Sequence, residues 1–499
     1  MAILHAISPH PLALVLGLGA SGLAMARWLS CQGYAVRVLD TRAAPPQLPA
    51  LRAALPQVEF QTGAFDAQAL SAEVSLVCTS PGISPASSAG LRQAAAERGV
   101  PVLGELELFA RGLRELDTLY AYRPKVLAIT GTNGKTTVAS LTGLLVQRAG
   151  LRVEIAGNIG PCLLDRLRAC MLGYCLPEVW VLELSSFQLH DAHSFAPSAA
   201  VVLNITQDHL DWHGDMQEYI ADKLKVFAPS TTAIINRDEG EFAFTSRIAN
   251  KNKISYGLNL PQGHLDFGLD EGAGDIAWLV QSVSALGGAV PKKNQDLEIS
   301  LNRLMPSESL RIQGRHNLSN ALAALALITA IDLPLGAPLR ALADYAGEPH
   351  RLQPVAQKQD VTYVDDSKGT NVGASVAAMN SLGCGLQAGQ KLLLIMGGDG
   401  KGQDFAPLTQ PLAQYARAAV LIGKDADAIA AFVPETVATQ RAASMQEAVQ
   451  ICAQAAQAGD TVLLSPACAS LDMYRDYAHR AEMFCAAVAQ VAAEGGKHE

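Results

Sequence analysis

The sequence has little charge and few aromatic residues, and it carries no basic excess. Charged residues make up 17% of the 499 positions and aromatic residues 5%, against 49% hydrophobic residues. A chain with so much apolar material and so little charge can bury a core, which excludes intrinsic disorder for most of its length. The net charge of −9 provides no positive field, and this excludes non-specific nucleic-acid binding.

A long apolar run is also missing. The longest uncharged stretches, residues 1–26 and 316–331, are interrupted by Gly, Pro or polar residues, whereas a membrane helix needs about 18–20 apolar residues in a row. Residues 12–26 are similar to the apolar core of a secretion signal, but no Lys or Arg precedes them, which argues against that interpretation. The sequence therefore predicts a cytoplasmic protein that does not bind membranes.

Paired cysteine motifs are absent as well. None of the nine cysteines forms C-x-x-C, and the closest pair is Cys170 and Cys175. A metal or redox use stays open, but buried, reduced thiols are the simpler interpretation and agree with a cytoplasmic setting.

What is present is a repeated strand–turn–helix pattern. A length of 499 residues corresponds to roughly three domains, and the pattern predicts doubly wound α/β domains with parallel sheets. The expected domains are residues 1–112, 113–347 and 348–499. The expected strands are 13–16, 36–40, 74–83, 126–130, 179–186, 199–206, 233–236, 362–367, 391–398, 418–423 and 461–467. We expect helices at 21–31 and 316–328, the second capped by an Asn near its start, and a loop-rich insertion at 257–310.

The segment GTNGKTT (131–137) follows the apolar strand 126–130 and precedes a helical pattern. Phosphate binding needs converging backbone N–H groups, a helix N-terminus and a cation. Gly131 and Gly134 permit the tight path, Lys135 can reach the β- and γ-phosphates, and Thr136 can ligate Mg²⁺. The spacing is not that of a strict G-x-x-x-x-G-K-[ST] loop, and an ordinary turn with a surface lysine is the alternative.

Two further polar sites follow strands of the second segment. Glu183 ends a buried strand, where a carboxylate beside a phosphate loop is well placed to bind Mg²⁺. Residues 204–214 contain Asp208, His209, Asp211 and His213. These can complete a metal site or simply form a polar loop, because their spacing is not that of a zinc site.

The first and third segments carry anion-binding patterns. GLGASG (17–22) fits G-x-G-x-x-G, with Asp40 at the end of the next strand for a ribose hydroxyl and Arg42 as a nearby cation. Such a turn suits NAD or a UDP group. In the third segment, Lys368 and Lys401 lie on glycine-rich loops, which suits an anionic amino acid, although each can also be a solvated charge.

These motifs together resemble the Mur ligases, the ATP-dependent amino-acid ligases of peptidoglycan assembly. The matching segments run in family order over nearly the whole chain. They are GLGASG with DTR (40–42), SPGI (80–83), GTNGKTT, GNIG (157–160), LELSSFQL (182–189), DHLDWH (208–213), HNLSNALAA (316–324), HR (350–351), DDSKGTN (365–371), GGDGKG (397–402) and SPACASLD (465–472). LSSFQL, DSKxTN and SPACASLD indicate the member that adds D-glutamate to UDP-N-acetylmuramoyl-L-alanine.

The resemblance implies three domains: a Rossmann-like N-terminal domain for the UDP-sugar, a central P-loop ATPase-like domain, and a Rossmann-like C-terminal domain for the amino acid. It also implies ATP, two Mg²⁺ ions and a monomer. The implied ATP-side residues are Gly131, Thr132, Asn133, Gly134, Lys135, Thr136, Thr137, Asn317, Asn320, Arg351 and Asp366. The implied UDP-substrate residues are Ala20, Ser21, Gly22, Asp40, Thr41, Arg42, Ser80, Pro81, Gly82, Asn158 and His209. The implied D-glutamate residues are Lys368, Thr370, Lys401, Ser470, Leu471 and Tyr477.

The metal ligands implied by the resemblance are Thr136, Glu183, His209 and Lys223, the last as a carbamate. Lys135, Glu183, His209, Lys223 and Lys401 form the implied catalytic set. The chain departs from the family pattern by extra residues near 111–122, near 166–178 and within 257–310. Tyr477 stands where phenylalanine is common, and Gly369 stands where alanine is common.

Three alternatives remain at this point. A nicotinamide dehydrogenase would use residues 17–22 but leaves GTNGKTT and Glu183 without a role. A P-loop switch or transport ATPase would use those two features but leaves the first and third segments unexplained. A ligase for another amino acid is the alternative nearest to the family prediction.

Overall fold

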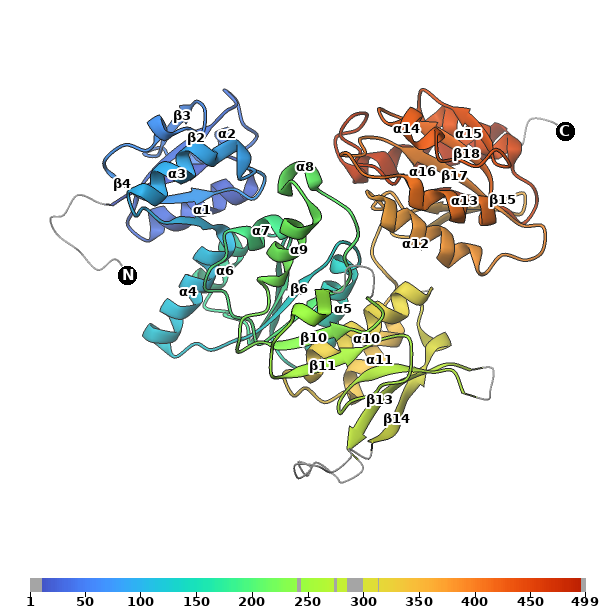
Figure 1. The fold of residues 1–499 in the computed structure, drawn as a ribbon, viewed down its shortest axis with the longest axis horizontal. Helices are drawn as coiled ribbons and strands as arrows, with labels where there is room; N and C mark the ends of the chain where they lie inside the picture. Colours follow the sequence, from blue (N-terminus) through green and yellow to red (C-terminus); the bar gives the residue numbers. More distant parts are fainter. Residues whose placement is uncertain (1–10, 240–243, 273–275, 285–298, 313, 495–499) are drawn as a thin grey trace.

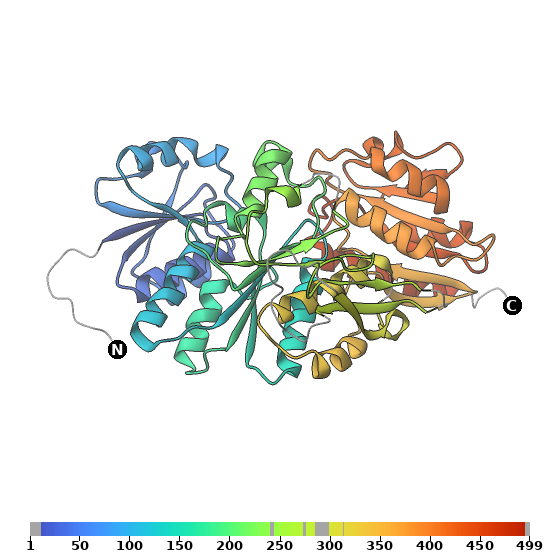
Figure 2. The ribbon, with the colours of Figure 1, turned by 60° about the horizontal axis from the view of Figure 1, so that its bottom comes forward.

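The computed structural model describes residues 11–239, 244–272, 276–284, 299–312 and 314–494. Within these ranges the strands form three sheets, each built from one continuous part of the chain and covered by helices (Figure 1). The N-terminal and C-terminal parts lie on opposite sides of the central part (Figure 2). The predicted α/β class and its division into three parts are confirmed.

The N-terminal sheet is parallel throughout, with the order β3-β2-β1-β4-β5. Its strands are β1 (Leu12–Leu16), β2 (Ala35–Asp40), β3 (Glu59–Thr62), β4 (Val74–Thr79) and β5 (Val102–Gly104). Its helices are α1 (Ala20–Cys31), α2 (Leu48–Ala54) and α3 (Ala89–Glu97). The turn from β1 into α1 needs glycine twice, because Gly17 has φ +80° and a Cβ on Gly22 would collide with the Gly17 carbonyl oxygen.

Residues 111–122 and 166–178, which the family resemblance predicts to be additions, lie in the connecting region. They belong to α4 (Glu105–Tyr120) and α6 (Leu163–Leu172) and to the segments that follow these helices. The Tyr122 hydroxyl donates to the Pro177 carbonyl at 2.7 Å and accepts from the Trp180 indole at 3.0 Å. The two extra segments therefore contact each other.

The central sheet has the order β14-β13-β12-β11-β10-β9-β6-β8-β7. Its parallel strands are β6 (Lys125–Thr130), β7 (Val153–Gly157), β8 (Val179–Glu183), β9 (Ala199–Val202), β10 (Thr232–Asn236) and β11 (Lys253–Tyr256). β12 (Phe267–Asp270), β13 (Trp278–Ser284) and β14 (Ile299–Pro306) extend it. β12 pairs parallel with β11, whereas the β12–β13 and β13–β14 pairings are antiparallel.

This extension corrects two predictions. The segment 257–310 is not simply loop-rich, and the sheet is not parallel throughout. Polar residues inside β13 and β14, such as Gln281, Ser282 and Asn302, hide the apolar alternation that would have identified the strands. Residues 273–275 and 285–298 of the predicted insertion lie outside the described residues.

The helices of the central part pack against its sheet and share its hydrophobic core. They are α5 (Lys135–Arg148), α7 (Ser186–His190), α8 (Leu210–His213), α9 (Met216–Leu224), α10 (Arg315–Thr329) and α11 (Gly336–Asp344). The predicted Asn cap of α10 is wrong, because Gly314, at φ +96°, occupies the cap position. Asn317 lies in the first turn instead, where its Oδ1 accepts from Asn320 at 3.1 Å.

Several predicted strands end earlier than their apolar runs. β8 stops at Glu183, because Ser185 caps α7 and forms a capping box with Gln188. β9 stops at Val202, and the chain then enters the loop that contains Asn204 and Asp208.

The C-terminal sheet has the order β15-β16-β20-β17-β18-β19, and its edge strand β15 is antiparallel to β16. The strands are β15 (Gln353–Lys358), β16 (Val361–Asp365), β17 (Leu392–Gly397), β18 (Ala416–Ile422), β19 (Ala438–Arg441) and β20 (Thr461–Leu464). The helices are α12 (Val372–Gly383), α13 (Thr409–Tyr415), α14 (Ala426–Ala430), α15 (Met445–Ala455) and α16 (Tyr477–Glu494). The predicted domain boundary at residue 112 lies inside α4, and the one at residue 347 lies between α11 and β15.

Among the described residues, the helices are too short or too polar for any of them to cross a lipid bilayer.

Candidate active site

The predicted phosphate loop is a tight turn between β6 and α5. Gly131 and Gly134 have φ angles of +148° and +83°, which only glycine adopts freely. The Lys135 ammonium, at the start of α5, donates to the carbonyls of Gly131 and Thr132 at 2.9 and 2.8 Å. Burial lowers the pKa of Lys135, while the nearby carboxylates of Glu183 and Asp208 favour its charged form. The loop thus holds a cation at a helix N-terminus, as anion binding requires.

A side chain that the sequence reasoning did not single out fixes this loop. The Asn204 amide accepts from the Asn133 backbone N–H at 2.8 Å and donates to the Asn133 carbonyl at 3.0 Å. Asn204 lies just after β9, and the only sequence signal for it was its position at a strand end. Its two bonds set the path of the loop before any ligand binds.

A second lysine reaches the same loop from α9. Lys223 is 2% exposed, its ammonium donates to the Gly131 carbonyl at 2.9 Å, and it lies 4.5 Å from the centre of the Tyr219 ring. Burial lowers the pKa of Lys223 well below its usual range, and the like charge of Lys135 adds to this shift.

Glu183, at the end of β8, carries a buried carboxylate that is only half satisfied. The side chain is 2% exposed, and its Oε1 accepts from Asn158 at 2.8 Å. Its Oε2 has no hydrogen-bond partner among the described residues. Thr130 Oγ1 and Asp208 Oδ1, both buried, likewise make no hydrogen bond there, although Asp208 Oδ1 lies 3.5 Å from the Lys401 ammonium.

Hard oxygen donors of this kind suit Mg²⁺. No three His, Cys, Asp or Glu side chains form a ready metal cluster in the part of the chain that the structure describes. A metal here would therefore draw on a mixed set, such as Glu183 and Thr136 together with phosphate oxygens.

His209 carries a neutral imidazole that could bind a metal ion. Its backbone is left-handed (φ +57°), its ring packs edge-on against Phe187 at 4.7 Å, and its Nε2 lies 3.5 Å from Asp208 Oδ2. Burial lowers the pKa of His209 to about 4, and the neighbouring lysines add to this effect against the pull of Asp208. The imidazole is therefore neutral at neutral pH, which is the form that binds metals or accepts hydrogen bonds.

The structure separates the histidines of the predicted 204–214 cluster. His213 bonds to other residues than His209 does, with its Nε2 2.9 Å from Ser186 Oγ and its Nδ1 3.1 Å from Asp222 Oδ2. With its side chain 1% exposed, it joins α7, α8 and α9. Asp211 is exposed.

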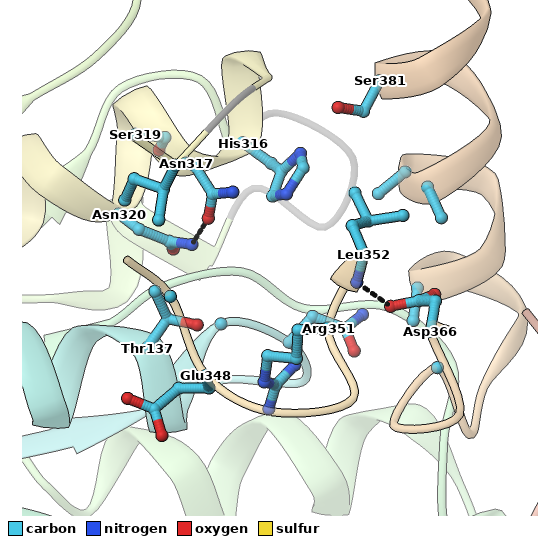
Figure 3. Close-up of a pocket in the computed structure, with 18 of the residues that line it drawn as sticks. Thr137, His316, Asn317, Ser319, Asn320, Glu348, Arg351, Leu352, Asp366 and Ser381 are labelled. Atoms are coloured by element: carbon cyan, nitrogen blue, oxygen red, sulfur yellow. Dashed lines mark hydrogen bonds between the residues drawn. The ribbon is translucent and has the colours of Figure 1, made fainter. Parts of the chain in front are cut away.

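A cavity of about 850 Å³ lies between the central and C-terminal parts. Figure 3 shows Asn317 and Asn320 of α10 on one side, α12 with Ser381 on the other, and Arg351 and Asp366 below. Asp366 accepts from the Ser465 hydroxyl at 2.7 Å and from the Leu352 backbone at 3.3 Å. Burial raises the pKa of Asp366 to about 7. The cavity is of the size that holds a nucleotide. Seven of the eleven predicted ATP-side residues line it, namely Asn133, Gly134, Thr137, Asn317, Asn320, Arg351 and Asp366, whereas Gly131, Thr132, Lys135 and Thr136 do not.

The predicted amino-acid side of the site faces the central part. The Lys368 ammonium lies 3.7 Å from the centre of the Tyr477 ring. Burial lowers the pKa of Lys368 to about 8, and Arg351 contributes to this. Lys401 is paired with Asp208 across the two parts. Of the other predicted residues, Ser470 is buried, Thr370 is half-buried and Leu471 is exposed.

The predicted UDP side lies at the carboxyl ends of β1, β2 and β4, separate from the cavity. Asp40 is 2% exposed and accepts from the Leu18 N–H at 2.7 Å and from Arg42 at 2.8 and 2.9 Å. The Arg42 guanidinium holds the pKa of Asp40 at about 2. Asp40 and Arg42 therefore form an ion pair with two hydrogen bonds. Ser80 Oγ donates to the Gly17 carbonyl at 2.9 Å. The remaining predicted residues, Ala20, Ser21, Gly22, Thr41, Pro81 and Gly82, lie on the loops and helix start around them.

The sequence matches the Mur ligase MurD-like N-terminal domain over residues 12–104, the Mur ligase middle domain over 129–328, and the Mur ligase glutamate ligase domain over 350–468. A protein of Burkholderia multivorans named UDP-N-acetylmuramoylalanine--D-glutamate ligase is 53% identical over 502 residues, which cover 98% of each chain. The chain belongs to the Mur ligase family.

Other Mur ligases agree with this placement. The UDP-N-acetylmuramoylalanine--D-glutamate ligase of Burkholderia cenocepacia is 52% identical, again over 98% of each chain. Among solved structures, the MurF ligase of Thermotoga maritima in complex with ADP has a TM-score of 0.58 at 15% identity, covering 96% of this chain and 95% of that one. MurF of Acinetobacter baumannii has a TM-score of 0.56 at 19% identity, with 91% and 86% covered. This Mur ligase therefore shares the fold of structurally known members.

Proposed function

We propose that this Mur ligase joins D-glutamate to UDP-N-acetylmuramoyl-L-alanine at the expense of ATP, releasing ADP and phosphate. The observation that carries the proposal is the sequence identity to relatives named UDP-N-acetylmuramoylalanine--D-glutamate ligase. This identity is 51–53% over nearly the full length. The three parts of the molecule support it. The N-terminal part carries most of the predicted UDP-substrate residues, the central part most of the ATP-side residues, and the C-terminal part the D-glutamate residues. We further propose that the enzyme is a cytoplasmic monomer, with domain boundaries near residues 112 and 347.

The proposed reaction has two steps. The γ-phosphoryl group of ATP passes to the L-alanine carboxylate of the UDP-sugar and gives an acyl phosphate. The amine of D-glutamate then attacks the acyl carbon, and phosphate leaves as the amide forms. Lys135, at the start of α5, neutralises charge on the transferring group, because such transfer depends mainly on positioning and electrostatics. A closed arrangement of the central and C-terminal parts excludes water from the acyl phosphate.

The buried, half-satisfied donors fit two Mg²⁺ ions. Glu183 and Thr136 would hold one, and His209 with a carbamate on Lys223 would hold the other. The ions would neutralise the phosphate oxygens. The lowered pKa of Lys223 supports the carbamate, because CO₂ adds only to an uncharged amine and an ammonium cannot bind a cation.

Lys223→Ala is therefore expected to lose most activity, because the second metal site loses its ligand. Wild-type activity is expected to fall when CO₂ is removed from the buffer and to return with bicarbonate. Phosphate release with and without bicarbonate measures both effects. Normal activity of Lys223→Ala, without any CO₂ dependence, would remove this role.

The charge of Lys368 predicts a pH limit for D-glutamate binding. Its pKa of about 8 means that the ammonium is present below pH 8 and is lost as the pH rises through 8. We expect kcat/KM for D-glutamate to fall above pH 8 by about tenfold per unit in the free enzyme. Lys368→Arg keeps a charge at high pH, so its profile should lack this decline even though its absolute rate is lower. Identical declines in both proteins would contradict the assignment.

One assay tests the function as a whole. Phosphate release with UDP-N-acetylmuramoyl-L-alanine is compared for D-glutamate, L-glutamate, L-lysine and meso-diaminopimelate. Stimulation by D-glutamate alone is expected, and its absence would refute the specificity. Phosphate release without any amino acid would favour a switch or transport ATPase, and an NADH absorbance change would favour a dehydrogenase.

A further inference from the structure

A pair of asparagine amides joins the phosphate loop to the C-terminal part. Asn371 precedes α12, is 4% exposed, and lies 238 positions from Asn133 along the chain. The Asn133 Nδ2 donates to Asn371 Oδ1 at 3.2 Å, and the Asn371 Nδ2 donates to Asn133 Oδ1 at 3.0 Å. Two amides facing each other in this way satisfy a donor and an acceptor on each side without any charge.

The orientation of the Asn371 amide is fixed by two other partners. Its Oδ1 accepts from the Ala374 backbone N–H at 2.9 Å, as a helix cap does, and this requires oxygen at that position. Its Nδ2 also points at Asp208 Oδ2 at 3.4 Å, and an ionised carboxylate can only accept. Asn133 is fixed from its own side by the two backbone bonds to Asn204. The Asn371 amide and the Asn133 backbone are therefore both held in place independently of the pair.

The surroundings show that the contact is close. A Cβ on Gly373, at the start of α12, would lie 2.7 Å from Thr206 Oγ1, so α12 packs directly on the loop that follows β9. The same loop carries Gln207, whose Oε1 accepts from the Asp404 backbone at 3.0 Å, and Asp208, which pairs with Lys401. Both asparagine partners adjoin the nucleotide-sized cavity: Asn133 lines it from the phosphate loop, and Gly373 and Ala374 line it from α12.

We propose that Asn371 is a positioning residue: through Asn133 and Asp208 it holds the C-terminal part closed on the phosphate loop during phosphoryl transfer and amide formation. This inference rests on the proposed ligase function. Asn371 touches no reacting atom. Its role is to couple closure of the C-terminal part to the catalytic conformation of the phosphate loop. The amino-acid side of the site is then in place only when the phosphate loop is correctly formed.

Asn371→Asp separates this role from helix capping. Aspartate caps a helix as well as asparagine does, so α12 and the thermal midpoint should be retained, within about 2 °C. The replaced amide nitrogen becomes a second acceptor facing Asn133 Oδ1 and the Asp208 carboxylate, which disfavours the closed arrangement. We expect kcat to fall at least about tenfold, while ADP affinity, measured by calorimetry, changes less than about threefold. Wild-type kcat in this variant would overturn the proposal, and so would an equal loss in ADP affinity.

A double-mutant cycle tests whether the pair acts as a unit. Asn371→Ser keeps a capping hydroxyl but is too short to reach Asn133, and Asn133→Ala removes the other partner. If the amides act together, the double variant should lose little more kcat than the worse single variant, whereas independent roles would multiply. Gln207→Ala is the control, because it removes an exposed contact across the same interface and should change kcat by less than about threefold.

A structural measurement keeps the test independent of turnover. Small-angle X-ray scattering with ADP present should give a larger radius of gyration for Asn371→Asp than for the wild type, whether or not the wild type uses D-glutamate. Equal radii would overturn the closing role. A wild type without D-glutamate-dependent phosphate release would refute the proposed function alone, so the two failures are distinguishable.

Discussion

Lys135→Ala is expected to lower kcat by about three orders of magnitude while leaving binding of the UDP-sugar substrate nearly unchanged. The ammonium stands at the N-terminus of α5 and bonds to the carbonyls of Gly131 and Thr132, two residues of its own loop. The ammonium is therefore in position before ATP binds. The two carbonyls hold it there, and phosphate oxygens can replace them when ATP binds. Most of the predicted UDP residues lie at the carboxyl ends of β1, β2 and β4 in another sheet, and the substitution does not reach these. Asn158 and His209 belong to the central part, but the side chain of neither bonds to Lys135 in the described residues.

The controls for this prediction follow from the local structure. Lys125→Ala removes an exposed lysine from the start of β6, the strand that leads into the same loop, and should leave kcat unchanged within about twofold. Phosphate release measures turnover, and calorimetry measures UDP-substrate binding. Near-normal turnover of Lys135→Ala would remove the lysine from the reaction, and loss of UDP-substrate binding would indicate a wider structural defect.

The parts of the fold that the sequence predicted well are those with buried apolar runs. The expected strands at 126–130 and 36–40 correspond to β6 and β2 within one residue at each end. The strands that were missed are short, polar or partly exposed. β3 reads EFQT, and β19 reads ATQR with all four residues exposed. A strand that buries little has little apolar periodicity, so only its neighbours in the sheet define it.

The candidate site divides in the same way. Gly131, Gly134 and Lys135 act over a few residues, and the local sequence was enough to predict them. Asn204, which holds the phosphate loop, and Asn371, which meets it from the C-terminal part, depend on contacts between segments 71 and 238 positions apart. The residues next to each asparagine in the sequence do not indicate which distant segment it contacts. The wrong Asn cap of α10 has a similar origin, because Gly314 satisfies the helix start through its backbone and leaves Asn317 to face the cavity.

Glu183→Gln is expected to reduce kcat by about 10³-fold at ordinary Mg²⁺ concentrations, since a metal that neutralises phosphate charge supplies several kcal/mol. Glutamine keeps the hydrogen bond from Asn158, because an amide oxygen can replace Oε1. What changes is the second oxygen, which is buried in the wild type and has no hydrogen-bond partner in the described part of the chain. It becomes an NH₂ group that cannot bind a cation. The substitution therefore removes the proposed metal ligand and keeps the hydrogen bond.

Thermal stability distinguishes the loss of this metal ligand from a packing defect. Glutamine avoids most of the desolvation cost of the buried carboxylate but also removes a charge that favours the Lys135 ammonium. Because these two effects oppose each other, the thermal midpoint of the ligand-free Glu183→Gln protein should change little. Glu178→Gln, at the exposed opposite end of β8, is the matched control and should alter neither kcat nor the thermal midpoint. A lower midpoint together with lost activity would make Glu183 a structural residue, and full activity with an unchanged Mg²⁺ requirement would exclude it as a ligand. The remaining outcome is an unchanged thermal midpoint together with activity that recovers only at raised Mg²⁺. This result would identify Glu183 Oε2 as a cation ligand whose burial costs folding stability.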